Sequence, residues 1–309
     1  MKGRLRTRMA LVGMLSAWLL LCAIDASAAQ VVTISGNQAV ATISLTNGAG
    51  TFDAVVTITF DTPANLTATE LNLTATLVDP NDIALLARLP TCGPPCVTVD
   101  PAFPMLITVE PLSLPWVFHS GFETGETTPG NLGFLNTYEF EIYTTDLDCT
   151  APGVGFTCPS TPYRLFKAPL TGNFDDITDD VLKGSVRARG RGGAMSQFLI
   201  VKDTRASLNV EQGKAFNLEA RIRSASLSDS LRTQLLGQLA QVQVAVLLTM
   251  DYAQAIIYLD QLKTVIQAHA GIDVANVWSS DHTLVNDAGE MLSLAQTLRF
   301  TLVRLQNGN

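Results

Sequence analysis

Residues 136–146, NTYEFEIYTTD, alternate between two kinds of side chain. Tyr138, Phe140 and Ile142 fall on one side of an extended chain, and the glutamates between them fall on the other. Successive side chains of a strand point to opposite faces of the sheet. The stretch therefore predicts a half-buried strand, and we expect its three apolar side chains to be buried.

This strand lies within a longer run of strand-like segments that ends near Arg205. The segments are short, rich in Val, Ile and Thr, and separated by turn residues such as Gly48-Ala49-Gly50. They cover residues 32–46, 52–60, 65–78, 83–89, 106–109, 116–119, 163–167, 184–189 and 196–202. Many short strands at regular intervals predict an antiparallel β-sandwich, in one unit or in two packed halves.

From about Ser207 the apolar residues follow helical spacing, as Leu231, Leu235 and Leu239 illustrate. We expect three main helices with short links, a short leading helix over 214–223, and hence a small antiparallel bundle. The expected helix caps are Ser228, then Asp251 or Thr249, then Ser280 or Asp281, with Gly271 ending the second helix. The sequence thus predicts a multi-domain β plus α protein, with a signal peptide over 1–28, a β-sandwich over 29–205 and a helical bundle over 206–309.

The first 28 residues resemble an export signal. A basic start (Lys2, Arg4, Arg6, Arg8) precedes an apolar core, and Ala26-Ser27-Ala28 offers a small-x-small cleavage site. Lipidation at Cys22 is the alternative, but Leu21 stands where the processing enzyme requires a small residue. We expect a secreted or periplasmic protein cleaved near Ala28, with no transmembrane segment in the mature chain.

The charge of the chain argues against nucleic acid as a partner. The whole sequence has 20 basic and 28 acidic residues; removal of the signal, with four basic and one acidic residue, leaves 16 and 27, a net charge of −11. An acidic chain repels phosphate backbones.

Four cysteines follow the signal: Cys92, Cys96, Cys149 and Cys158. An even number in an exported chain predicts disulfides, and the close pairs 92–96 and 149–158 favour two local bridges, although crossed pairings remain open. Redox or metal chemistry is the alternative for Cys92 and Cys96, but their spacing is not Cys-x-x-Cys.

The segments YRLFKAPLTGNFDDIT and SQFLIVKD resemble an uncharacterised family of exported bacterial β-proteins, which implies a fold and no function. The C-terminal part resembles the helical FIMAH-type module of exported bacterial proteins, to which no catalytic residues are assigned. The matching residues are Ser230, Leu231, Leu235, Leu236, Ala255, Leu259, Leu262, Ile266 and Gly271.

Two charged rows are candidates for a glycan or anion site. Glu139 and Glu141 share one strand face at about 6.5–7 Å, within the 5–9.5 Å that glycosidases need. Arg187, Arg189 and Arg191 also recur at every second residue. We favour mutual pairing of the two rows on neighbouring strands, a common way to stabilise a sheet face. The alternatives are a carboxylate pair that acts on glycans and an arginine row that binds an acidic sugar or phosphate.

The segment NFDDITDD is a weak candidate for a metal site, and calcium is the ion it would suit. Its oxygen ligands would come from Asn173, Asp175, Asp176, Asp179 and Asp180. The spacing is not that of an EF-hand loop, so we favour a polar turn between strands and expect no cofactor.

The sequence contains no Gly-x-Ser-x-Gly, no His-Glu-x-x-His and no phosphate-binding glycine loop, and the three histidines (His119, His269, His282) do not cluster, so nothing points to a catalytic triad. Aromatic residues near the acidic loop, namely Trp116, Phe118, Phe122 and Phe134, would suit a sugar-binding surface, although core positions are the simpler interpretation. We expect a non-catalytic binding or scaffold protein of the cell envelope or extracellular space, with an unknown protein or glycan as partner. The alternative is a carbohydrate-active protein: a glycan binder would need an exposed aromatic platform, and a hydrolase would need both glutamates in a cleft.

Overall fold

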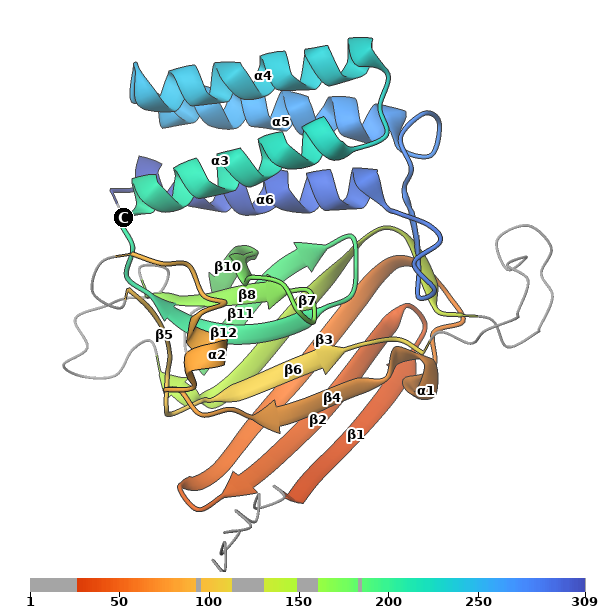
Figure 1. The fold of residues 1–309 in the computed structure, drawn as a ribbon, viewed down its shortest axis with the longest axis vertical. Coiled ribbons are helices and arrows are strands. Elements are labelled where there is room, and N and C mark those ends of the chain that lie inside the picture. The colour runs from red at the N-terminus through yellow and green to blue at the C-terminus, as the bar shows by residue number, and fades with distance from the viewer. Residues whose placement is uncertain (1–26, 93–95, 113–130, 149–160, 183–184, 309) are drawn as a thin grey trace, which may run out of the picture.

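Two antiparallel β-sheets pack against each other, and four helices from the last third of the chain lie across one end of them (Figure 1). The computed structural model describes residues 27–92, 96–112, 131–148, 161–182 and 185–308. This arrangement confirms the predicted sandwich followed by helices.

The first sheet contains the strand with which the sequence analysis began. Its order is β1-β2-β3-β7-β11-β10, and β13 also pairs with β7. The strands are β1 (Ser27–Ser35), β2 (Gln38–Asn47), β3 (Gly50–Ala64), β7 (Gly133–Asp148), β10 (Thr178–Leu182), β11 (Ser185–Gly192) and β13 (Val277–Ser279). Strand β7 therefore has neighbours on both sides, β3 and β11.

The second sheet has the order β4-β6-β12-β8-β9, and β5 also pairs with β12. The strands are β4 (Leu73–Leu77), β5 (Val97–Val99), β6 (Met105–Val109), β8 (Tyr163–Ala168), β9 (Asp175–Asp176) and β12 (Gln197–Asp203). The central strand β12 is apolar on both faces, because one face meets the first sheet and the other meets a separate apolar cluster.

The main core lies between the sheets. Tyr138, Phe140 and Ile142 are fully buried there, as their alternation predicts. Phe140 stacks on Phe198 of the second sheet with 3.7 Å between ring centroids. Aromatic contacts of this kind add to the stabilisation from burial.

Three predicted strand segments differ from the structure. Residues 32–46 form two strands, because the chain turns at Gly36, where φ is +58°. Residues 65–78 contain helix α1 (Ala68–Leu71) before β4, and residues 83–89 begin with helix α2 (Ile83–Leu86) instead of a strand. Thr67 and Asp82 cap these short helices through their side chains. Periodicity does not separate a helical turn from a strand in so short a run. The predicted strand at 116–119 lies outside the described residues.

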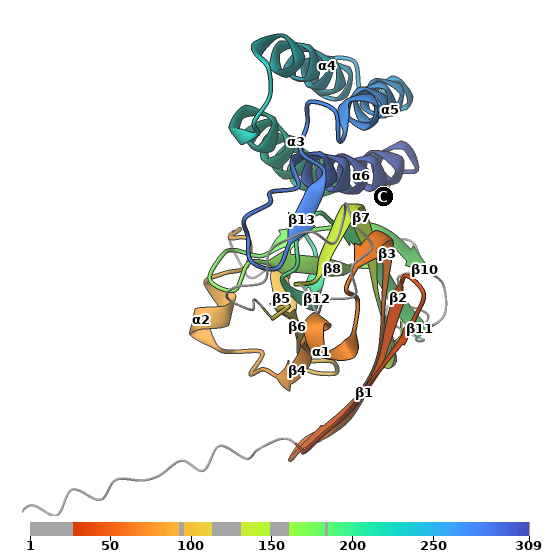
Figure 2. The ribbon, with the colours of Figure 1, turned by 90° about the vertical axis from the view of Figure 1, so that its right-hand side faces the viewer.

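The helical part consists of α3 (Ser207–Ser224), α4 (Asp229–Leu247), α5 (Tyr252–His269) and α6 (Asp287–Gln306). Ser228 and Asp251 cap α4 and α5 as predicted. The prediction for the last helix is wrong: α6 is capped by Asn286, not by Ser280 or Asp281. Residues just before it form β13, which leaves the helical layer and joins β7 (Figure 2). No helix in the described ranges is long and apolar enough to cross a membrane.

Polar side chains hold the helices onto the sandwich. The Lys214 ammonium lies 2.7 Å from the Asp176 carboxylate, and Glu290 Oε1 is 3.2 Å from Lys167 Nζ. The Thr297 hydroxyl donates to the backbone oxygens of β9 and β10, at 3.1 Å and 2.8 Å. Since the last third of the chain supplies both these contacts and β13, the sandwich and the bundle share one interface.

Candidate functional site

The two charged rows pair with each other on the outer face of the first sheet. Arg189 lies opposite Glu141, and Arg191 lies opposite Glu139. Arg189 Nε is 2.5 Å from Glu141 Oε2, and Arg191 Nη2 is 3.0 Å from Glu139 Oε2. Arg187 reaches Glu141 Oε1 at 3.3 Å. The predicted pairing is confirmed, and we call these five residues the charged ladder.

Both glutamates of the ladder accept charge-assisted hydrogen bonds: Glu141 from Arg187 and Arg189, and Glu139 from Arg191. The residues that alternate with the arginines in β11, namely Ala188, Gly190 and Gly192, are small and buried on the inner face. A Cβ on Gly192 would collide with the Tyr138 hydroxyl, which donates to the Ala194 oxygen at 2.7 Å. The alternation of Arg and Gly in β11 thus gives the strand a charged outer face and an inner face that packs closely against the core.

The aspartates of NFDDITDD diverge instead of converging on one point. Asp176 pairs with Lys214, Asp179 lies 3.0 Å from Arg191, and Asp175 accepts from the Asn217 amide at 3.0 Å. The segment also forms strands β9 and β10, so the predicted polar turn is wrong. Asp180 lies opposite Arg189 across β10 and β11. Among the described residues, no three His, Cys, Asp or Glu side chains gather in a way that could hold a metal ion.

The remaining candidates are dispersed. Cys92 and Cys96 lie at disulfide distance, with their Cα atoms 6.1 Å apart. Phe134 is buried and stacks on Trp278, which excludes it from a surface platform. His269 pairs with Asp273 at 2.7 Å, whereas His282 packs against Trp278 in a T-shaped contact with 6.0 Å between ring centroids. Cys149, Cys158, Trp116, Phe118, His119 and Phe122 lie outside the described residues.

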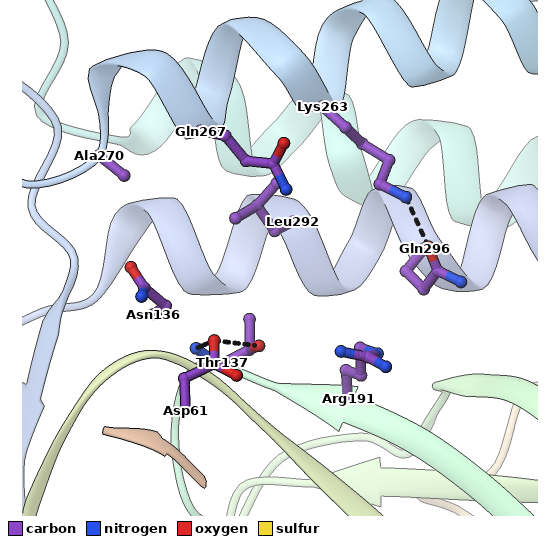
Figure 3. A pocket seen from close by; sticks show the side chains of 9 residues that line it. All are labelled: Asp61, Asn136, Thr137, Arg191, Lys263, Gln267, Ala270, Leu292 and Gln296. Atoms are coloured by element: carbon purple, nitrogen blue, oxygen red, sulfur yellow. Dashed lines mark hydrogen bonds between the residues drawn. The ribbon is translucent and has the colours of Figure 1, made fainter. Parts of the chain in front are cut away.

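A cleft of 480 Å³ opens where the outer face of the first sheet meets α5 and α6 (Figure 3). We call it the sheet–helix cleft. Its floor comes from β3, β7 and β11, and its roof from the two helices and the residue after α5. The lining residues are Asp61, Asn136, Thr137, Arg191, Lys263, Gln267, Ala270, Leu292 and Gln296. Its volume falls within the range typical of small-molecule sites.

A bulge in β7 shapes one end of this cleft. Phe60 pairs with Tyr138 and Thr62 with Leu135, so Asp61 faces an extra residue on β7. Asn136 takes the left-handed conformation there, with φ of +55°. Asp61 Oδ2 accepts from the Thr137 amide at 3.3 Å and from its hydroxyl at 3.1 Å. Bulges re-aim side chains, and this one directs a carboxylate, a hydroxyl and an amide to the same place.

The other end of the cleft carries two cations, Arg191 and Lys263 (Figure 3). The Lys263 ammonium donates to Gln296 Oε1 at 2.6 Å. Burial lowers the pKa of Lys263, and although Asp260 counteracts this, repulsion from Arg299 and Arg191 lowers it further. An anionic group between the two side chains would relieve that repulsion.

Sequence reasoning found Arg191 but missed the rest of the cleft. Asp61, Asn136 and Lys263 come from segments far apart in the chain, and only the docking of the bundle brings them together. The one local signal was Asn136 at the start of the opening stretch, since Asn adopts positive φ more readily than most residues. A bulge was therefore detectable in principle, whereas its helical roof was not.

Comparison with known proteins places the chain in a family. No curated protein matches it. A family model described as a family of unknown function, DUF6689, matches residues 16–306 and so spans both the sandwich and the helices. The chain therefore belongs to the family of unknown function DUF6689.

Proposed function

We propose that this protein is an exported, non-catalytic binding protein of the cell envelope or extracellular space, and that the sheet–helix cleft holds its ligand. The observation that carries the proposal is a 480 Å³ polar cleft with cations at one end and a carboxylate at the other. Export is supported by the basic start, apolar core and Ala26-Ser27-Ala28 site at the N-terminus.

The cleft favours a ligand that has an anionic group and several hydroxyls, as an acidic saccharide does. Arginine is well suited to carboxylates. Arg191 already donates from Nε to Asp179 and from Nη2 to Glu139, so a ligand carboxylate would bind its remaining guanidinium donors, and Lys263 adds a second positive charge. At the other end, Asp61 accepts hydrogen bonds, the Asn136 amide can donate while its oxygen accepts from Asn276 at 3.0 Å, and the Gln267 amide can both donate and accept. Such groups suit sugar hydroxyls, which also donate and accept.

Binding without catalysis is supported by the state of the charged ladder. A glycosidase needs one carboxyl group that donates a proton and a second that acts as base or nucleophile. Glu139 and Glu141 are instead held by Arg191, Arg189 and Arg187. Neither glutamate lines the sheet–helix cleft.

Calorimetric titration of residues 29–309 tests the proposal. We would compare oligogalacturonate with the neutral galactose oligomer of equal length, because the two differ chiefly in the carboxylate. We expect the acidic oligomer to bind and Lys263→Met to weaken it about tenfold. Lys202→Met makes the same chemical change on β12, outside the cleft lining, and should leave affinity unchanged. Equal affinity of both variants would place the site elsewhere.

Export is tested separately by fractionation of cells that make the full chain. We expect a processed protein whose N-terminus lies near Ala29, in the periplasm or the medium. An unprocessed chain that remains in the cytoplasm would contradict this part of the proposal and leave the binding result intact.

A further inference from the structure

A second cleft, of 540 Å³, lies beside α3 where the first helix of the bundle meets the sandwich. We call it the α3 cleft. Its walls are α3, the residues that follow α2, and the segment that leads into β9. It shares no lining residue with the sheet–helix cleft.

An aromatic side chain borders the α3 cleft and faces solvent. Phe216 is 68% exposed and is the only aromatic among the large apolar side chains left exposed in the described ranges. Helical neighbours on the opposite side of α3, such as Ala215 and Leu218, are fully buried in the bundle. Phe216 thus contributes little to the core, and its ring faces are open to a ligand.

Polar groups line the cleft beside this ring. Asp175 Oδ1 accepts from the Asn217 amide at 3.0 Å, an interaction that leaves Oδ2 and the Asn217 oxygen available as acceptors. Asn173 adds an exposed amide. Gly213 also lines the cleft, and a Cβ there would meet no atom within 4 Å, so the helix backbone is open to the cleft.

The positive charges near the cleft are already neutralised. Lys214 is paired with Asp176, and Arg205 binds both carboxylate oxygens of Asp203, the closer at 2.7 Å. Asp175, by contrast, accepts its hydrogen bond from a neutral amide, that of Asn217. The cleft therefore favours a neutral ligand over an anion.

The cleft is also held rigid. Arg88 donates to the backbone oxygens of Gly172 and Pro169, both at 2.7 Å, and lies over the Phe174 ring at 4.7 Å. The Phe174 amide in turn donates to the Arg88 oxygen at 2.8 Å. These contacts fix the segment that carries Asn173 and Asp175, so little ordering would accompany ligand binding.

We propose that the α3 cleft is a second binding site and that it takes a neutral saccharide. A pyranose ring has an apolar C–H face, which suits stacking on Phe216, and a hydroxyl edge, which suits Asp175 and Asn217. This is the exposed aromatic platform that a glycan binder requires, and it is independent of the ligand assigned to the sheet–helix cleft.

Saturation-transfer NMR and calorimetry on residues 29–309 test this site, with neutral gluco-, xylo- and chito-oligosaccharides as probes at millimolar concentration. We expect at least one oligomer to bind, with saturation on the C–H protons of one ring face. Phe216→Ala should weaken binding at least tenfold and Asp175→Asn about three- to tenfold. Both positions are exposed, so we expect the variants to fold.

Two controls make the result specific. Ile257→Ala removes an exposed apolar side chain from α5, and Lys263→Met alters the sheet–helix cleft; neither should change the affinity for the neutral oligomer. The proposal fails if none of the probes binds, or if the affinity survives both Phe216→Ala and Asp175→Asn. It also fails if sedimentation shows a dimer that Phe216→Ala dissociates, because the face would then be an interface between two copies.

Discussion

The charged ladder on the outer sheet face and the Lys214–Asp176 pair beneath the bundle use the same chemistry at different depths. Their nitrogen–oxygen distances are alike, 2.5–3.3 Å for the main ladder contacts and 2.7 Å for the buried pair. The exposed side-chain fractions are 44% for Arg187 and 10% for its partner Glu141, against 5% for Lys214 and 3% for Asp176, so the ladder is open to solvent on its arginine side. The comparison shows that the nitrogen–oxygen distance alone does not predict how much an ion pair affects stability, because a buried pair loses more solvation than an exposed one.

The buried pair is complete in its hydrogen bonds. The Lys214 ammonium donates to Asp176, to the Thr297 oxygen at 3.2 Å and to the Thr301 hydroxyl at 3.0 Å. Burial alone would raise the pKa of Asp176, but Lys214 and Arg164 hold it below its usual value. Burial lowers the pKa of Lys214, although Asp176 opposes this. The pair therefore links the stability of the sandwich to that of the bundle.

Replacement of Lys214 by Met should have the largest effect on stability. It leaves the Asp176 carboxylate buried without its closest cation, and loss of one partner of a buried pair costs about 3–5 kcal/mol. Urea denaturation followed by circular dichroism measures the change. The double variant Lys214→Met/Asp176→Leu should recover most of the loss, because it removes both charges. If Lys214→Met lowered the free energy of unfolding by less than about 1 kcal/mol, the buried pair would behave like an exposed one, and the proposed effect of burial would be wrong.

Glu211 contrasts with Asp176, because it is also a buried carboxylate but its Oε1 has no hydrogen-bond partner in the structure. Burial raises its pKa from 4.5 to about 7. The raised pKa means that the folded state binds the proton more tightly. Its stabilising contribution is therefore complete below about pH 4.5 and is lost as the pH rises through 7.

Glu211→Gln should accordingly stabilise the protein at high pH by about 2–3 kcal/mol and change little at pH 5. Urea denaturation at pH 5 and pH 8.5 measures both values. Glu219→Gln makes the same change at a half-exposed position of α3, where it removes only a solvent-screened pair with Arg223, and serves as the control with an expected change within about 0.5 kcal/mol at either pH. An equal effect of Glu211→Gln at both pH values would show that its carboxyl group does not titrate in this range.

The two regions also differ in how far they follow from sequence. The charged ladder could be predicted from sequence, because side chains on one face of a strand recur at every second residue and both charged rows have that spacing. The burial of Lys214 and Glu211 does not follow from sequence, since charged residues on a helix normally face water. For Lys214 it is contact with β9 and α6 that removes the ammonium from water. Strand β13 could not be predicted for the same reason, because it depends on a tertiary contact. A segment of three residues shows no strand periodicity of its own, and it becomes a strand only by pairing with residues 133–135 of β7.

Arg189→Gln tests the ladder itself. Its guanidinium binds Glu141 at 2.5 Å, but Arg187 still reaches Glu141 after the change. We expect a loss of about 1 kcal/mol, because the pairs remain partly solvated. Urea denaturation with and without 0.5 M NaCl measures it, and salt should reduce the difference. A loss as large as that of Lys214→Met would mean that the ladder is effectively buried.

The exposed ion pair on α3 should contribute least to stability among the pairs compared. Arg223 and Glu219 lie 2.7 Å apart at helical spacing i,i+4, with Arg223 61% exposed. Arg223→Gln should cost only about 0.3–0.5 kcal/mol and almost nothing in 0.5 M NaCl, because solvent and salt already screen these charges. The same urea series measures it. Since this distance equals that of Lys214 and Asp176, a difference of several kcal/mol between the two variants would reflect burial, whereas equal losses would show that the depth of a pair has no influence in this protein.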